Sequence, residues 1–232
     1  MKINNKIFTL GALLFCITLE AAPFDSTYIA EPSATSLLKN ANIYDGEGNE
    51  FIDYDLLIQD GKIKAIGPNL DSDIENVAIY DLSGMWVTPG IIDLHSHMGV
   101  YSAPGVKTSS DGNESTSPVT ADVWAEHSVW TQDPQFSLAL QGGITTFHVL
   151  PGSANLIGGR GTTFKNIQSN TIQGMKFPEA PHSLKMACGE NPKRVYGSRR
   201  QAPSTRMGNI AGYRKAWIKA AKYRENMNSY ES

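Results

Sequence analysis

Long apolar runs, cysteines and an excess of one charge are all scarce in this chain of 232 residues. Its 20 lysine and arginine residues face 23 aspartate and glutamate residues, so no basic surface suited to nucleic acid is expected. No apolar run reaches the roughly 20 residues that a transmembrane helix requires, so we expect no stable membrane span in the mature chain. An apolar share of 41% is ordinary for a globular protein.

The N-terminus differs in composition from the rest of the chain. Lys2 and Lys6 precede a largely apolar stretch over residues 7–19, and Ala21-Ala22-Pro23 follows it. This stretch is typical of a secretory signal peptide over residues 1–22, although Glu20 stands where a small residue is preferred. A buried N-terminal helix is the alternative. We therefore predict export, to the periplasm if the source is Gram-negative.

Only two cysteines are present, and one of them lies in the predicted signal peptide. Removal of Cys16 with that segment would leave Cys188 alone, so no intramolecular disulfide is expected. The mature chain must then be stabilised by a hydrophobic core or by a metal.

Residues 37–87 contain short apolar runs separated by turn signals. Strand-like runs at residues 55–59 and 62–66 flank Asp60-Gly61, a dipeptide typical of a tight hairpin. Further short strands are expected at residues 41–44, 78–80 and 85–87. This pattern predicts a small antiparallel β domain.

The run from Val87 to Met98 contains a His-x-His pair directly after an apolar, strand-like stretch. Side chains at i and i+2 of a strand share a face, so His95 and His97 would project together from its C-terminal end. Two neighbouring imidazoles can bind a divalent metal, most often zinc. A structural or surface role is the alternative for a bare His-x-His.

The remaining residues, 88–232, predict strands and helices in alternation. We expect a helix from Asp133 to Leu140, a strand over 144–150, a strand over 184–188 and a helix from Ser204 to about Asn226. Residues 151–182 look irregular, with a short strand at 162–167. A strand–helix–strand order is typical of a parallel sheet. A complete eight-stranded α/β barrel needs roughly 250 residues, so the segment is long enough for only part of one.

Several of these segments resemble the amidohydrolase superfamily. Residues 58–67 resemble the hairpin of its small sandwich domain, Val87 to His97 its first barrel strand, and residues 141–146 its junction into the second strand. Residues 122–127 and 153–161 resemble an exported, imidazolonepropionase-related branch. The resemblance implies an α/β fold: a β-sandwich segment over 37–87 followed by the N-terminal half of a metal-dependent (β/α)8 barrel over 88–232, which is incomplete.

The resemblance also implies roles for particular residues. His95 and His97 would bind a catalytic divalent metal, with zinc as the first expectation, while Asp93 would support a ligand by a hydrogen bond. A third ligand would be a carboxylate such as Glu190 or a carboxylated lysine, for which Lys185 is the weaker candidate; an exposed loop acid is the alternative for Glu190. His148 would pack in the barrel or line the site. The general-base aspartate of the family has no counterpart in residues 1–232.

Two functions from different classes follow. The first is a metal-dependent hydrolase that cleaves carbon–nitrogen bonds of small amides or cyclic amides by attack of metal-bound hydroxide. The second is a truncated, inactive fragment that at most binds metal or a complementing C-terminal half. A half barrel leaves an unpaired apolar strand edge, so the expected partners are that complementing half or a second copy of the chain.

Overall fold

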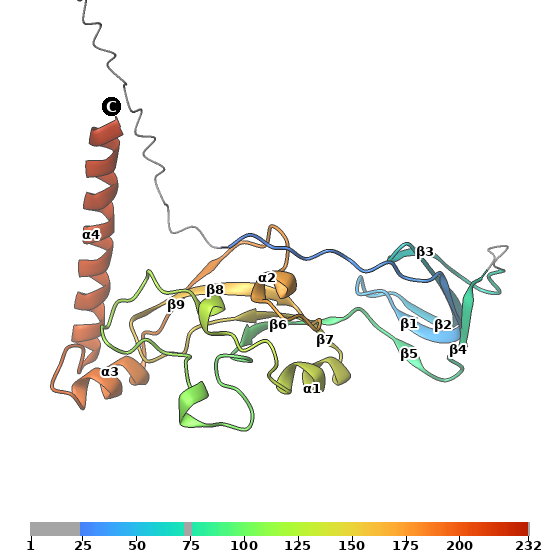
Figure 1. Cartoon of the computed structure of the whole chain (residues 1–232), viewed down its shortest axis with the longest axis horizontal. Coiled ribbons are helices and arrows are strands. Elements are labelled where there is room, and N and C mark those ends of the chain that lie inside the picture. The colour runs from blue at the N-terminus through green and yellow to red at the C-terminus, as the bar shows by residue number, and fades with distance from the viewer. Residues whose placement is uncertain (1–23, 72–75, 232) are drawn as a thin grey trace, which may run out of the picture.

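Two β-sheets, joined by a short linker after residue 87, organise the chain (Figure 1). The structure is a computed structural model that describes residues 24–71 and 76–231. The predicted signal peptide, residues 1–22, lies outside the described residues. The first sheet contains five strands and the second contains four.

The first sheet is built around β1 (Ser36–Tyr44), β2 (Glu50–Gln59) and β3 (Lys62–Gly67), which pair antiparallel in the order β3-β2-β1. Asp60 and Gly61 both have positive φ, 52° and 68°, as the two central residues of a type I′ hairpin turn require. The hairpin predicted at this dipeptide is therefore confirmed.

The expectation of a wholly antiparallel domain is wrong. β4 (Ala78–Asp81) and β5 (Trp86–Val87) both pair with β1 in the parallel sense. The chain leaves β3 at one edge of the sheet and returns along the free edge of β1, running in the direction of β1. Ala41, Ile43 and Leu56 form the core on one face of this mixed sheet. Among the described residues it is a single sheet, so the sandwich is not established.

The second sheet begins with a strand–helix–strand unit. β6 (Ile91–Ser96) is followed by α1 (Gln135–Gln141) and β7 (Ile144–Val149), and β6 pairs with β7 in parallel. This confirms the predicted unit. Its consequence for function is that the carboxyl ends of both strands meet at one edge of the sheet.

The next two strands depart from the expected strand–helix repeat. β8 (Ile157–Lys165) pairs antiparallel with β7, and β9 (Ser183–Met186) pairs antiparallel with β8. Residues 151–182, expected to be irregular, therefore contain a nine-residue strand. The run Gly158-Gly-Arg-Gly161 concealed it, because glycine has a low strand propensity.

The second sheet has one buried and one polar face. Phe147, Val149 and Phe164 are fully buried and pack with Phe136 of α1 in a single core cluster. Side chains on the opposite face of the same strands include His148 and Thr163, because successive strand residues alternate between faces.

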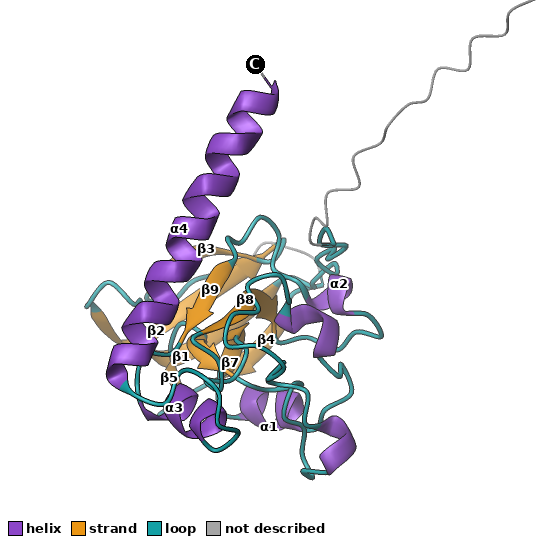
Figure 2. Cartoon of the chain, turned by 90° about the vertical axis from the view of Figure 1, so that its left-hand side faces the viewer, coloured by secondary structure: helices purple, strands orange, loops and turns teal. Residues whose placement is uncertain are grey.

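The other helices are η1 (Lys107–Ser109), η2 (Ala125–Ser128), α2 (Ile172–Met175), α3 (Glu190–Gly197) and α4 (Arg206–Glu231) (Figures 1 and 2). Ala125 of η2 and Met175 of α2 belong to the core cluster on the buried face. α4 projects away from the sheets, and the face expected to be apolar is largely exposed: Met207, Ile210 and Trp217 are all more than half accessible. Thr205, rather than the predicted Ser204, caps it by accepting a hydrogen bond from the Gly208 N–H. Within the described residues, no helix is long and apolar enough to cross a membrane.

A buried ion pair connects distant segments beside the second sheet. Lys176 Nζ lies 2.6 Å from Glu126 Oε2, and it also donates to the Phe24 carbonyl at 2.6 Å. Thr162 of β8 donates to the same Glu126 oxygen at 3.2 Å. The pair thus fastens η2, β8 and the segment at residue 24 to one another.

We expect Glu126→Ala to lower the free energy of unfolding by about 3–5 kcal/mol, because it leaves the Lys176 ammonium buried without its counter-ion. Urea unfolding followed by circular dichroism measures the change. Lys193→Ala is the matched control, since its partner Glu190 is 71% exposed, and it should cost less than about 1 kcal/mol. Equal losses in the two variants would contradict this account.

Candidate active site

The two histidines of the His-x-His pair lie side by side at the carboxyl end of β6. Their ring centroids are 5.3 Å apart and the ring planes are nearly perpendicular, at 86°. Ser96, between them, is buried, so the alternation of the strand directs His95 and His97 away from the core together.

The orientation of His97 is set by the neighbouring strand. Its Nδ1–H donates to the carbonyl of Leu150, directly after β7, over 2.9 Å. A backbone carbonyl can only accept, so this contact assigns the proton to Nδ1 and leaves Nε2 with a free lone pair. Such a contact is the usual way in which proteins orient a metal-binding imidazole.

Lys185 lies on β9, at the edge of the sheet opposite β6, and its side chain extends to the histidine pair. Its Nζ lies 3.0 Å from Nε2 of His95. Burial lowers the pKa of the Lys185 ammonium, and the nearby Lys185 charge is the main cause that lowers the pKa of His95. Lys185 forms no ion pair with any described residue. Its amine therefore lies beside the basic imidazole of His95 with no carboxylate among those residues to neutralise it.

Glu190, the preferred carboxylate ligand from sequence, is not brought to the pair. It is the first residue of α3, its side chain is largely exposed, and it lies 3.2 Å from Lys193 on the same helix. β9 ends at Met186, so the chain has already turned away from the sheet before residue 190. The structure thus brings Lys185, and not Glu190, beside His95.

Two aspartates support the backbone around the histidines. Asp93 accepts a hydrogen bond from the backbone N–H of His95 over 3.0 Å, so its contact is with the main chain of a candidate ligand. Asp133 is buried and accepts from the N–H groups of Gly99 and Ala103, at 3.0 and 3.3 Å. It thereby ties the loop that follows His97 to the start of α1. Sequence reasoning did not single out Asp133 for this role.

His148 lies on the polar face of the sheet with both ring nitrogens engaged. Nδ1 is 2.9 Å from Thr163 Oγ1 and Nε2 is 2.6 Å from Ser183 Oγ. Burial lowers the pKa of His148, and repulsion from His182 and His95 lowers it further. The ring is therefore a hydrogen-bonded neutral imidazole that lines the region of the pair. Ser183 was missed from sequence, because a lone serine in a short strand carries no signal.

The donor set fits part of a divalent-metal site. Two imidazoles held side by side suit two positions of a zinc coordination shell. Across residues 24–71 and 76–231, however, no three His, Cys, Asp or Glu side chains are grouped closely enough to hold a metal ion. Lys185 can complete such a set only as a carbamate, which converts its amine into a carboxylate-like ligand.

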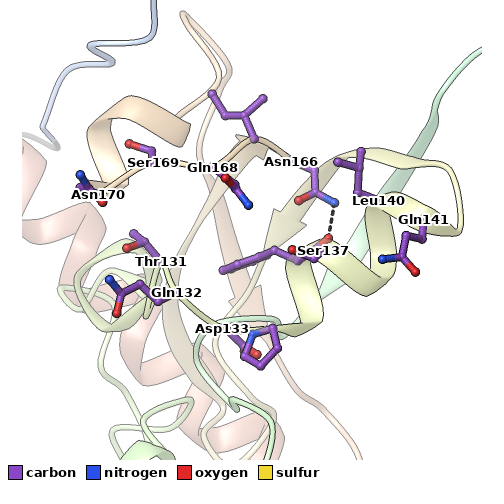
Figure 3. A pocket seen from close by; sticks show the side chains of 13 residues that line it. Thr131, Gln132, Asp133, Ser137, Leu140, Gln141, Asn166, Gln168, Ser169 and Asn170 are labelled. Atoms are coloured by element: carbon purple, nitrogen blue, oxygen red, sulfur yellow. Dashed lines mark hydrogen bonds between the residues drawn. The ribbon is translucent and has the colours of Figure 1, made fainter.

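Two cavities lie at opposite ends of the second sheet. One of about 810 Å³, shown in Figure 3, lies between α1 and residues 166–170, where Asn166 donates to the carbonyls of Phe136 and Ile144. It adjoins the start of β7, the end away from the histidines. Another of about 500 Å³ includes Pro151, just past Leu150, and so adjoins the carboxyl end.

Comparisons with known proteins point to one superfamily. The chain is 35% identical over 179 residues to the amidohydrolase tasK of Hapsidospora irregularis, covering 72% of this chain and 18% of that protein. It is 44% identical over 84 residues to a dihydroorotase of Lactobacillus leichmannii, covering 35% of this chain and 18% of the relative. No family model matches.

A solved structure supports the same relationship at the level of the fold. An amidohydrolase from Thermotoga maritima superimposes with a TM-score of 0.76 at 39% identity, covering 83% of this chain and 49% of that one. These similarities support assignment to the amidohydrolase superfamily, whose members among the relatives act on carbon–nitrogen bonds. The chain spans about half the length of the solved neighbour and 18% of the two curated relatives.

We expect His148 to make the protein less stable in acid. The folded state keeps this ring neutral where an unfolded histidine, with a pKa of about 6.5, takes up a proton, so the free energy of unfolding falls as the pH drops below that value. His148→Gln should therefore flatten this fall, measured by urea unfolding at a series of pH values. His127→Gln, at an exposed ring, is the control, and equal flattening in both variants would contradict the assignment.

Proposed function

We propose that this chain is the N-terminal half of a metal-dependent amidohydrolase that cleaves the carbon–nitrogen bond of a small amide or cyclic amide. The observation that carries the proposal is the grouping of His95, His97 and Lys185 at the carboxyl end of a parallel strand pair. In α/β barrels this end is where catalytic groups gather. The 39% identity to an amidohydrolase of the same fold supports it.

Each of the three side chains has a defined part in the proposal. His95 and His97 offer Nε2 lone pairs, and the Leu150 carbonyl holds the His97 ring in place. The Lys185 amine adds to carbon dioxide, losing a proton and forming an anionic carbamate beside the imidazoles. A divalent metal held by these groups would polarise the substrate carbonyl and lower the pKa of a bound water to about 7.

The finer parts of the proposal come from the sequence motifs. The segments 122–127 and 153–161 favour an imidazolonepropionase-related branch, and the imidazole pair favours zinc. The basic, then apolar N-terminus favours a signal peptide over residues 1–22 and export, with the periplasm as the site of action in a Gram-negative source.

A second candidate function is that of an inactive half that requires a complementing partner. β6 is an edge strand, and Ile91, Ile92 and Leu94 are 53%, 58% and 74% exposed. An apolar, unpaired edge of this kind favours pairing with another chain. Because the chain matches 49% of the Thermotoga maritima neighbour, the partner of choice is the remaining half of such a barrel, with a second copy of this chain as the alternative.

The metal proposal is tested by titration of the purified chain with zinc in bicarbonate buffer, with binding followed by calorimetry. His95→Ala and His97→Ala should each weaken binding by more than about tenfold, since even loss of a group that supports a ligand costs that much. Lys185→Met should weaken it as well. His127→Ala, outside the pair, is the control. Failure of the unaltered chain to bind zinc, or tight binding by both histidine variants, would overturn the proposal.

The edge proposal is tested by Leu94→Lys together with Ile92→Lys. Charges on an exposed edge strand suppress edge-to-edge pairing, so the double variant should be more soluble and should no longer co-purify with the C-terminal half of the Thermotoga maritima amidohydrolase. Ile63→Lys, on the first sheet and 65% exposed, is the matched control. Hydrolysis of cyclic amides by the isolated unaltered chain would contradict the need for a partner.

A further inference from the structure

Strand β8 is an inner strand of the second sheet, and it has glycines at positions where the strands beside it carry polar side chains. It lies between β7 and β9, with Gly159 opposite Lys185 and Gly161 opposite Ser183. On its other side, Thr163 is opposite His148. Side chains from the flanking strands can therefore reach over β8 and meet above its backbone.

His148 and Ser183 make such a contact. Although β8 separates their strands, His148 Nε2 lies 2.6 Å from Ser183 Oγ, and Thr163 Oγ1 holds the other ring nitrogen at 2.9 Å. A Cβ atom at position 161 would lie 2.6 Å from Ser183 Oγ and 2.8 Å from His148 Nε2. Any side chain there would occupy the space of this hydrogen bond, so glycine at 161 is a condition for it.

The same face of β9 carries the candidate ligand. Ser183 and Lys185 are two residues apart on one strand and therefore point to the same side. Lys185 also reaches over β8, past Gly158, where a Cβ atom would lie 3.8 Å from Lys185 Cγ, and places its Nζ 3.0 Å from His95 Nε2. The two contacts over β8 thus join β9 to β7 and to β6.

We infer that His148 and Ser183 are positioning residues, whose hydrogen bond over Gly161 holds β9 where Lys185 meets His95. This inference rests on the proposed function only where it treats Lys185 and His95 as metal ligands. The backbone ladder alone leaves the curvature of the sheet free to relax, because β8 supplies no side chain to pack between His148 and Ser183 at position 161. The His148–Ser183 contact supplies that constraint from above the strand.

The test is competitive acetylation of Lys185 with acetic anhydride, quantified by mass spectrometry in the metal-free chain. Lys165 is the internal reference, because its ammonium lies over the rings of Tyr28 and Phe177. Ser183→Ala should raise the labelling of Lys185 relative to Lys165 by about three- to tenfold, the effect of losing one hydrogen bond. Ser183→Thr, which keeps the hydroxyl, should restore the original ratio.

Further variants separate the contact from general loosening of the strand. His148→Ala should raise the labelling ratio of Lys185 to Lys165 as much as Ser183→Ala does. The double variant should raise it no further, because both substitutions remove the same hydrogen bond. Gly161→Ala should act in the same way by intruding on that bond. Leu184→Ala, on the opposite face of β9, is the matched control. An equal rise in this control, or no restoration by Ser183→Thr, would overturn the inference.

The outcome is independent of whether the protein binds metal. Zinc titration of the unaltered chain decides the proposed function, whereas the labelling ratio is read without metal. A chain that binds no zinc yet shows the predicted ratios would retain the positioning role and lose the metal assignment. If the chain binds zinc but the labelling ratio is unchanged in all variants, the metal assignment would stand and the positioning role would be lost.

Discussion

The parallel ladder between β6 and β7 determines where the polar groups of the candidate site can lie. Parallel pairing requires a crossover, supplied by α1, and it aligns the carboxyl ends of both strands at one edge. At that edge the Leu150 carbonyl, after β7, meets the ring of His97, after β6. An antiparallel pair would have put these two groups at opposite ends of the sheet.

The glycines of β8, which carry no side chains, shape the polar face of the second sheet. Gly159 and Gly161 weaken the strand as a structural element, since glycine packs nothing and loses more entropy on folding. Their benefit is spatial, because a Cβ atom at Gly161 would intrude on the His148–Ser183 hydrogen bond and one at Gly159 would collide with Val123. Close approach of neighbouring segments therefore explains these two glycines of the run Gly158-Gly-Arg-Gly161.

Strand β6 carries both an exposed apolar edge and an incomplete ligand set. In the described residues the second sheet ends at β6 on one side and β9 on the other, so apolar side chains such as Leu94 face solvent. On the other face of β6, His95 and His97 have no third His, Cys, Asp or Glu grouped with them among the described residues.

Local patterns predicted the elements whose cause is local. The Asp60-Gly61 hairpin depends on two positive φ angles, and the common face of His95 and His97 depends on strand alternation, so both could be derived from adjacent residues. Helix α1 and strand β7 were predictable for the same reason. Export, metal identity and the two proposed functions remain predictions of the sequence motifs.

Features that depend on distant contacts could not be derived in this way. That Lys185 rather than Glu190 lies beside His95 depends on where β9 ends and on the curvature that brings residue 185 to residue 95. The direction of β8 and the parallel pairing of β4 with β1 likewise depend on the path of the chain between strands. The sequence by itself determined which side chains could carry the chemistry, because residue type and strand period are local properties. Only the tertiary structure decided which of them meet, because that depends on pairing between segments far apart in the chain.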